Sequence, residues 1–531
     1  MPQRPVTDRP QLDRAPLDRI QLEGRPRRAP EPPPTGPAAG AGAAAERLQY
    51  NQRLSALIEE AGFSHAGLAR RVDQLGSEHG LDLRYDKTSV TRWLRGQQPR
   101  GATPALIAEV FTRRLGRRLT AQDLGLDACA PVYAGLEFAE SPAEAVDIVA
   151  SMWRKDTGAH SELRRIAFTP AGLVVPSRDW LIGRTDDRVA RETPQDLGRG
   201  GIPAQARRDG AGAAGAGAGG EAAAALRGVP RVSRGDVAAM RAVGDLFRAL
   251  DNAYGGGHAR QALIRYLESE AEPMLRGRYN EAIGRALFGA VADLTRLAGW
   301  TSYDIGAHGL AQRYFVQSLR LAQAANDRLY GGYVLVTMSR QAVYLGHGRE
   351  AVQLARVAQQ GVGSTAPAAA QALMHAAEAR GHGLLGDARS CTAALVRAER
   401  ALQASHGGDE LPSWARFFDE AQLADEFAHC YRDLQQWRPA AQHAERSLRL
   451  RPQTYARSRV FCRVVLATSR LGLGELDEAC AAATEALRGV TEMRSLRAVE
   501  YLRDFARRLA PYRGNPSVRA FEEAARAAGL I

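Results

Sequence analysis

Apolar residues recur at i, i+3 and i+4 in several short segments between residues 48 and 126. This spacing predicts amphipathic helices. The first is expected over Arg53 to Gly62, and the second follows Ser64, an N-cap residue, through GFSHAGLARRV. A later helix opens at Pro104, and TAQDLG caps one more short helix from Thr120. The inward faces of the first, second and Pro104 helices are Leu54, Leu57, Ile58 and Ala61; Ala66, Leu68, Ala69 and Val72; and Leu106, Ile107, Val110, Phe111 and Leu115.

The segment KTSVTRWLRG, between these helices, predicts a helix with one buried and one polar face. Val90, Trp93 and Leu94 share the buried face, and Gly96 ends the helix in a left-handed conformation. Hydroxyls suit phosphates and base edges, and arginine can fork onto guanine, so the polar face matches a DNA major groove. An ordinary surface helix would show the same pattern, so the flanking segments must decide. The polar face carries Lys87, Thr88, Ser89, Thr91, Arg92 and Arg95.

Four or five short helices within about eighty residues, with the polar helix third, follow the order of a helix-turn-helix domain. GFSHAGLARRV resembles the second helix of the Xre-type (Cro/CI-like) repressor family, and SVTRWLRGQQP resembles its third helix and following turn. The resemblance covers roughly Leu48 to Leu126. One departure is DQLGSEHGLDLRYD, between Val72 and Lys87, which exceeds the 3–4-residue turn of the compact motif. We expect a lengthened second helix and a loop, which leaves the docking angle open.

Positive charge is concentrated in the same region. From Arg47 to Arg118 there are 13 lysines and arginines against 7 acidic residues, a difference of +6 out of +12 for the whole chain. A basic domain attracts polyanions through counterion release. An acidic lipid surface would also attract it, but the apolar faces are short and segmented, unlike a long interfacial helix. The charge therefore favours double-stranded DNA as the partner.

Length and composition bound the remaining possibilities. A chain of 531 residues should hold two to four domains. No apolar run approaches the ~20 residues that span a bilayer, and the N-terminus lacks the apolar core of a secretory signal. We therefore expect a cytoplasmic protein without membrane contact. The scattered cysteines, never at CxxC spacing, indicate reduced core residues: Cys129, Cys391, Cys430, Cys462 and Cys480.

Composition shifts divide the chain into five parts. A disordered tail (1–45) precedes the helix-turn-helix domain (46–128), a connecting segment (129–184), a Gly/Ala-rich flexible linker (185–228) and a helical-repeat domain (229–531). The connecting segment begins as an amphipathic helix whose apolar face is Ala145, Ile148, Val149, Met152 and Trp153. Its second half should be more extended and dock back on the first domain, with Phe168, Val174, Val175, Trp180 and Leu181 between prolines.

The linker contains a misleading glycine pattern. Gly210, Gly212 and Gly215 satisfy GxGxxG, but a dinucleotide site also needs a preceding strand, a following helix and an acid about twenty residues on. The low-complexity surroundings supply none of these.

Two-helix units recur after residue 229. The clearest unit holds Ala428, Tyr431, Ala440, Ser447 and Pro452 at offsets 0, 3, 12, 19 and 24, the spacing of tetratricopeptide repeats. Small residues at these offsets let paired helices approach closely, which predicts an α-solenoid with a concave binding surface. A plain helical bundle is the alternative. Related offsets are kept by Gly299, Ala311, Phe315 and Ser318; by Ser339, Ala351, Ala355 and Ala358; and by Ala467, Ala479, Ala483 and Ala486.

Motifs for catalysis are missing from the sequence. It contains no GxxxxGK[ST] phosphate loop, no HExxH, no paired Cys/His cluster and no GxSxG elbow. We therefore expect a protein that is not an enzyme and has no cofactor or metal.

The chain as a whole resembles actinomycete regulators that join an N-terminal Xre-type helix-turn-helix to a C-terminal tetratricopeptide-like domain. RYDKTSVTRWLRGQQPRG and LEFAESPAEAVDIVASMWRKD look particularly like that group. The resemblance implies an all-α transcription regulator of sporulation, morphological differentiation and antibiotic or other secondary metabolism.

The main hypothesis is a sequence-specific regulator that binds DNA as a homodimer at an inverted repeat. A receptor with a peptide or protein ligand in the solenoid groove, or a non-enzymatic interaction scaffold, remains an alternative. Bases and nearby phosphates would be contacted by Lys87, Thr88, Ser89, Thr91 and Arg92, and the DNA backbone by Ser64, His65 and Arg95.

Overall fold

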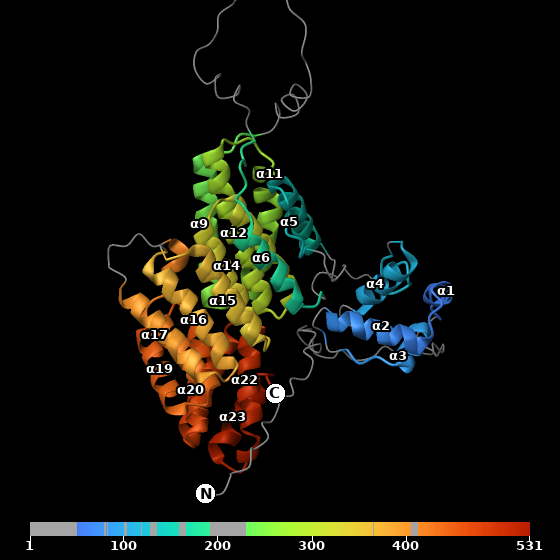
Figure 1. Ribbon diagram of the computed structural model, residues 1–531. Coiled ribbons are helices and arrows are strands. Elements are labelled where there is room, and N and C mark those ends of the chain that lie inside the picture. Colours follow the sequence, from blue (N-terminus) through green and yellow to red (C-terminus); the bar gives the residue numbers. More distant parts are fainter. Residues whose placement is uncertain are drawn as a thin grey trace, which may run out of the picture.

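The computed structural model is helical throughout the residues it describes (Figure 1). These are residues 50–78, 81, 83–99, 103–117, 119–127, 135–158, 166–191, 230–364, 366–404 and 412–531. Within those ranges there is one isolated bridge, between Arg231 and Arg278, and no β-strand. The all-α prediction is confirmed. The predicted tail and most of the predicted linker, including its three glycines, lie outside the described residues.

The N-terminal unit contains α1 (Gln52–Glu60), α2 (His65–Glu78), α3 (Lys87–Leu94) and α4 (Thr103–Leu115). Their apolar faces form one buried cluster that also includes Leu124 and Leu126. The lengthened second helix is confirmed because α2 runs to Glu78. Two predicted details were wrong. Ala66 is exposed and does not face inward. Thr120 to Gly125 forms successive turns in place of a short helix, because its amides donate to carbonyls three residues back.

Helical hairpins make up the chain from residue 230 onward, and neighbouring helices pack in pairs. The pairs are α9 (Arg234–Tyr254) with α10 (Gly256–Tyr266), α12 (Glu281–Asp304) with α13 (His308–Ala324), α14 (Arg328–Tyr344) with α15 (Gly348–Val362), α16 (Ala368–Leu384) with α17 (Ala388–Gln403), α18 (Glu420–Asp433) with α19 (Trp437–Leu450), and α20 (Ala456–Gly472) with α21 (Leu476–Thr491). The chain closes with α22 (Leu496–Arg508) and α23 (Pro516–Ala527), and the short α11 (Glu272–Leu275) precedes α12.

The small residues picked out by their offsets lie inside these hairpins. Ala311, Ala351, Ala440 and Ala479 are fully buried. Two serines at the same offset make the same bond: Ser318 Oγ donates to the carbonyl of Ala292 at 2.7 Å, and Ser447 Oγ to that of Ala421 at 2.8 Å. Each bond joins the second helix of a pair to the first across 26 residues. The offsets therefore mark a recurring helix–helix contact.

The predicted connecting segment belongs to the core of the hairpins. It contains α5 (Pro142–Thr157), the 3-10 turn η2 (Pro170–Leu173) and α6 (Val174–Ile182). Its residues Trp153, Leu173 and Trp180 lie in one apolar cluster with residues of α12 to α18. The predicted face of α5 is confirmed, because Ala145, Val149, Met152 and Trp153 are buried. The expectations of an extended second half and of docking on the first domain were wrong, since this half is helical and packs on α13 and α15.

Polar side chains of α13 hold this segment by its backbone. Gln312 exchanges hydrogen bonds with the Thr169 backbone at 2.7 and 3.0 Å, and Gln317 Nε2 donates to the carbonyls of Gly135 and Glu137. The prediction also placed the start of the linker too early, because the first linker residues are held by α13 as well. Asp186 accepts two bonds from buried Arg320, at 2.8 and 2.9 Å. Residues 185–191 are therefore packed on the hairpins.

Candidate nucleic-acid interface

Helix α3 begins with a reciprocal cap. The carboxylate of Asp86 accepts a hydrogen bond from the backbone N–H of Ser89 at 2.8 Å, and the Ser89 hydroxyl bonds the same carboxylate at 2.9 Å. Both hydrogen bonds lower the pKa of Asp86, and the bond from the backbone N–H has the larger effect. The Asp86 N–H donates in turn to the Ser89 hydroxyl at 3.5 Å, so the cap satisfies two backbone donors that a helix start leaves open. The helix is therefore set at Lys87, where the sequence predicted it.

The insertion before α3 folds back onto α2. The backbone N–H of Leu81 donates to the carbonyl of Gly76 at 2.8 Å. A Cβ at Gly76 would lie 2.5 Å from Leu83, so glycine allows the loop to lie against the helix. The extra residues thus cover α2, with Leu81 and Leu83 packed against the domain core.

Tyr85 locks the end of this insertion against α3. Its backbone N–H donates to both carboxylate oxygens of Asp73 on α2, at 2.9 and 3.0 Å. Its ring packs edge-on against Trp93 at 5.1 Å between centroids, and its hydroxyl bonds Thr103 at 2.9 Å. Asp73 and Tyr85 are positioning residues that the sequence reasoning missed. The available signal was alternation in the loop directly before the helix, where Leu81, Leu83 and Tyr85 stand between polar residues.

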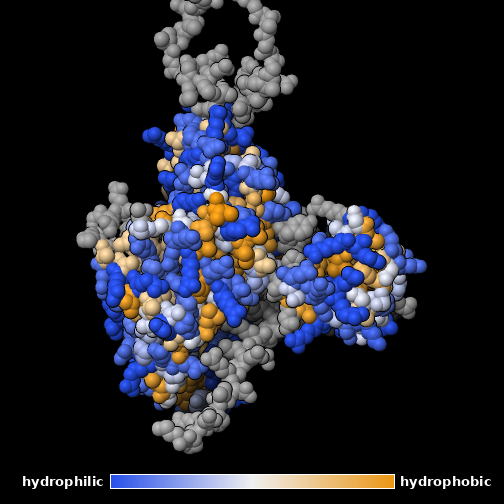
Figure 2. Space-filling view, in the orientation of Figure 1, coloured by the Kyte–Doolittle hydropathy of each residue, from blue (hydrophilic) through white to orange (hydrophobic). Residues whose placement is uncertain are grey.

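Most of the residues proposed for α3 share an exposed face. Lys87, Thr88, Arg92 and Arg95 are exposed, whereas Val90, Trp93 and Leu94 are buried. Thr91 is half-buried, and its hydroxyl donates to the carbonyl of Lys87 at 2.9 Å. In the view of Figure 2, the N-terminal unit is mainly hydrophilic along the edge where α3 lies.

Ser89 does not share this face. Its side chain is buried, with a residue exposure of 5%, and is held by Asp86. The Arg92 guanidinium also donates to its hydroxyl at 3.2 Å. The expectation of an outward Ser89 was wrong because the third residue of a capped helix turns its side chain back toward the cap.

Ser64 and His65 lie at the start of α2. Ser64 Oγ accepts the backbone N–H of Gly67 at 3.0 Å, which confirms the predicted N-cap. His65 is half-buried, and its Nδ1 lies 3.5 Å from Thr91 Oγ1. This contact brings the start of α2 beside α3, so the two predicted groups form one surface.

Charge is distributed unevenly over the N-terminal unit. On α4, Arg113 pairs with Glu109 at 2.9 Å and Glu78 at 3.1 Å. The hydrogen bond to Glu109 is the main cause of the raised pKa of Arg113. Arg117 pairs with Glu60 at 2.7 Å. By contrast, Lys87, Arg92 and Arg95 form no ion pair with any residue of the described ranges.

The described ranges hold no group of three or more His, Cys, Asp or Glu placed to bind a metal ion. Four of the predicted core cysteines are buried free thiols, and Cys129 lies outside the described residues. No helix in the described part of the chain is long and apolar enough to cross a membrane.

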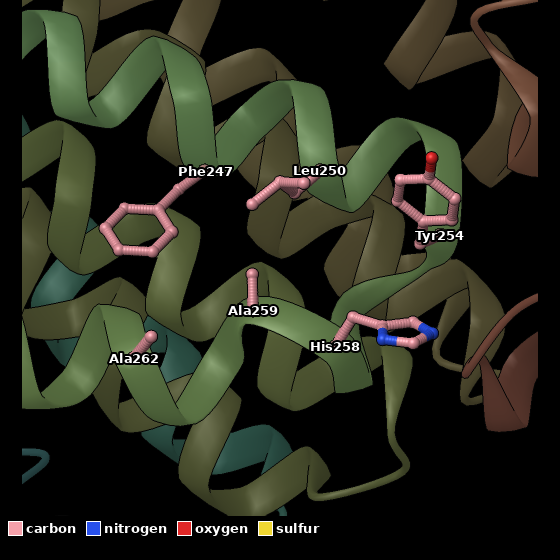
Figure 3. A pocket seen from close by; sticks show the side chains of 6 residues that line it. All are labelled: Phe247, Leu250, Tyr254, His258, Ala259 and Ala262. Carbon is pink, nitrogen blue, oxygen red and sulfur yellow. The ribbon is translucent and has the colours of Figure 1, made fainter.

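A shallow apolar hollow of about 420 Å³ lies between α9 and α10 (Figure 3). Tyr254 and His258 meet at one end of it, with ring centroids 5.8 Å apart. The hollow is lined by Phe247, Leu250, Tyr254, His258, Ala259 and Ala262.

Comparison with known proteins agrees with the boundaries of the N-terminal unit. No curated protein and no solved structure matches the chain. A family model described as the SP15 N-terminal domain matches residues 54–127, which span the cluster formed by α1 to α4 and the turns after them.

Proposed function

We propose that the protein is a sequence-specific DNA-binding transcription regulator in which α2 and α3 form a helix-turn-helix. The observation that carries this proposal is the exposed face of α3. Lys87, Arg92 and Arg95 lie there without ion pairs among the described residues, while Arg113 of α4 and Arg117 just after it are paired with glutamates. A cationic face on a short helix suits phosphates and base edges together.

The dimensions of α3 fit this role. Its 8 residues correspond to about 12 Å of helix, close to the width of the major groove of B-DNA. Arg92 is the leading candidate for reading a guanine, and Lys87, Thr88 and Arg95 for adjacent phosphates. The N-terminus of α2, beside Thr91, supplies further backbone amides for a phosphate.

The hairpins would provide dimerisation, partner binding or signal reception. Two copies of the DNA-binding unit would favour an operator with inverted half-sites. A role in morphological differentiation and secondary metabolism follows from the resemblance to actinomycete regulators.

Chromatin immunoprecipitation of the full chain, followed by sequencing, tests the proposal. We expect discrete peaks that share one motif, and in vitro binding to that motif that falls steeply with salt. The matched control carries Lys87→Ala, Arg92→Ala and Arg95→Ala, which should remove the peaks without unfolding α3. Flat occupancy by the unaltered chain would remove the regulator proposal and favour an interaction scaffold.

A further inference from the structure

The last hairpins meet the first across a polar seam. Apolar residues of α20 to α23 form their own cluster, separate from the large cluster of α12 to α18. Arg457 of α20 bridges the two parts. It donates to Asp251 of α9 at 2.5 and 2.6 Å and lies 3.3 Å from the carboxylate of Asp304.

Asp304 gathers four partners at this seam. Besides Arg457, it accepts hydrogen bonds from the Gly256 backbone at 2.8 Å and from Ser495 Oγ at 3.0 Å. Arg497 Nη1 lies 3.6 Å away. The end of α12 thus binds the starts of α10 and α22 through one buried carboxylate.

Arg497 of α22 enters an aromatic cage formed by Trp300, Tyr303, Tyr344 and Phe461. Its guanidinium carbon lies 5.4, 3.9, 5.4 and 4.8 Å from these four ring centroids, respectively. Arg497 is 8% exposed. Several desolvated rings attract a cation through cation–π interaction, and a guanidinium can also stack its flat face on a ring.

This guanidinium is nevertheless incompletely satisfied. Nε and Nη1 are buried without a hydrogen-bond acceptor. A buried donor without an acceptor destabilises the folded state, and so does a buried charge without a close partner of opposite charge. The cage therefore recognises the chemistry of arginine, while its present occupant is held less firmly than Arg457 is at Asp251.

Helix α22 presents two further side chains to the same surface. The Tyr344 hydroxyl donates to Glu500, and the ring of Tyr501 stacks on Tyr344 with centroids 6.1 Å apart at an interplanar angle of 8°. Tyr501 also meets Phe461 edge-on at 4.9 Å. Arg497, Glu500 and Tyr501 follow i, i+3 and i+4 spacing, the way in which a helical ligand anchors in a groove.

We propose that the aromatic cage is a binding site for an arginine side chain on a helical segment of a partner protein, and that Arg497 occupies it in cis until the partner displaces α22. In the structure the cage is filled by Arg497 of the chain's own α22. The partner would offer an arginine followed by an acid and an aromatic residue one turn later. This site does not depend on DNA binding.

The probe is a labelled peptide of residues 495–508, titrated into the full chain and into its Arg497→Ala variant. We expect the variant to bind at least about tenfold more tightly, because removal of the cis occupant raises the fraction of competent sites. The same peptide with the substitution Arg497→Leu should lose this gain in affinity. Equal binding of the two peptides, or no binding to the variant, would overturn the proposal.

A second measurement tests displacement in the unaltered chain. At saturating peptide, amide hydrogen exchange should increase in α22, and unchanged exchange there would show that Arg497 is fixed. If the Arg497→Ala variant fails to fold, Arg497→Met replaces it in both measurements, because methionine keeps a long side chain. The last titration uses L-arginine amide as the ligand. Tighter binding of this small molecule than of the peptide would reject a helical partner.

Discussion

Asp73 on α2 accepts the backbone N–H of Tyr85 on both carboxylate oxygens, at 2.9 and 3.0 Å, across twelve residues. This bond fixes the chain immediately before the cap of α3. Together with the contact between Tyr85 and Trp93, it lets α3 pack on α2 despite the insertion. One carboxylate and one aromatic ring thus hold α3 against α2.

We predict that Asp73→Ala destabilises the N-terminal unit by about 1–3 kcal/mol, because it leaves a partly buried N–H without its acceptor. DNA affinity should fall as well, since the start of α3 loses its anchor. Asp73→Asn retains one acceptor oxygen and should have a smaller effect. Thermal unfolding and fluorescence anisotropy with the motif DNA measure the two quantities, and equal losses in both variants would contradict the anchoring role.

Arg92→Ala should weaken binding to the preferred DNA by about 1–3 kcal/mol and relax the preference at one base pair. The matched control is Arg113→Ala, which removes one arginine from the paired cluster on α4. It should change affinity little, because its charge is already neutralised by two glutamates. Competition with a set of single-base variants separates the outcomes. Uniform weakening across all sequences would make Arg92 a phosphate contact.

The helices of the N-terminal unit were predictable because each hides one apolar stripe and starts or stops at a recognisable residue. Gly62 and Gly96 both have positive φ, at 66° and 91°, as their positions after helices suggested. Ser89 was less predictable. Its burial depends on a side-chain bond to Asp86, and helical periodicity carries no information about such a bond.

The segment around Trp180 shows a different limit. Pro170 and Pro176 suggested extended chain, but they occupy the first turns of η2 and α6, where a missing N–H costs nothing. Trp180 then fits against Gly331 of α14 and Gly361 of α15, where a Cβ would lie 2.3 and 2.2 Å from its ring. This slot combines residues more than 150 positions apart, and no local pattern in the sequence joins them.

The close approach of helices within a hairpin gives a sharp test in α12. A Cβ at Gly299 would lie 2.6 Å from the ring of Phe315 on α13. We expect Gly299→Ala to destabilise the hairpins by about 1–3 kcal/mol through overpacking. Gly289→Ala is the control on the same helix, where the nearest atom, Ala325 Cβ, is 3.7 Å away. It should stabilise by up to about 1 kcal/mol through helix propensity. Melting temperatures that move in the same direction for both variants would refute this interpretation of the repeat offsets.

His308 should make the hairpins sensitive to mild acid. Burial, and then the positive charge of Arg497, lower its pKa to about 4. Its ring lies 5.8 Å from that of Tyr303 and 5.6 Å from that of Tyr344, and its Nδ1 is buried without a partner. The folded protein therefore keeps this imidazole neutral where an unfolded chain would protonate it.

The sign of the effect follows from proton uptake. Below an ordinary histidine pKa near 6.5 the unfolded chain gains a proton that the folded protein refuses until about pH 4, so acid favours unfolding throughout this interval. We expect His308 to account for about 2–3 kcal/mol of the stability lost between pH 6.5 and 4. His308→Phe retains a ring of similar size without a proton to gain, so its stability should fall less over the same interval. Denaturant unfolding at pH 7, 6, 5 and 4 measures the difference, and parallel curves for the two proteins would exclude His308 as the source.

The His308 imidazole shares Tyr303 and Tyr344 with the cage around Arg497. Acid should therefore also favour the release of α22 from the cage. We expect faster amide exchange in that helix at pH 5 in the unaltered chain than in the His308→Phe variant.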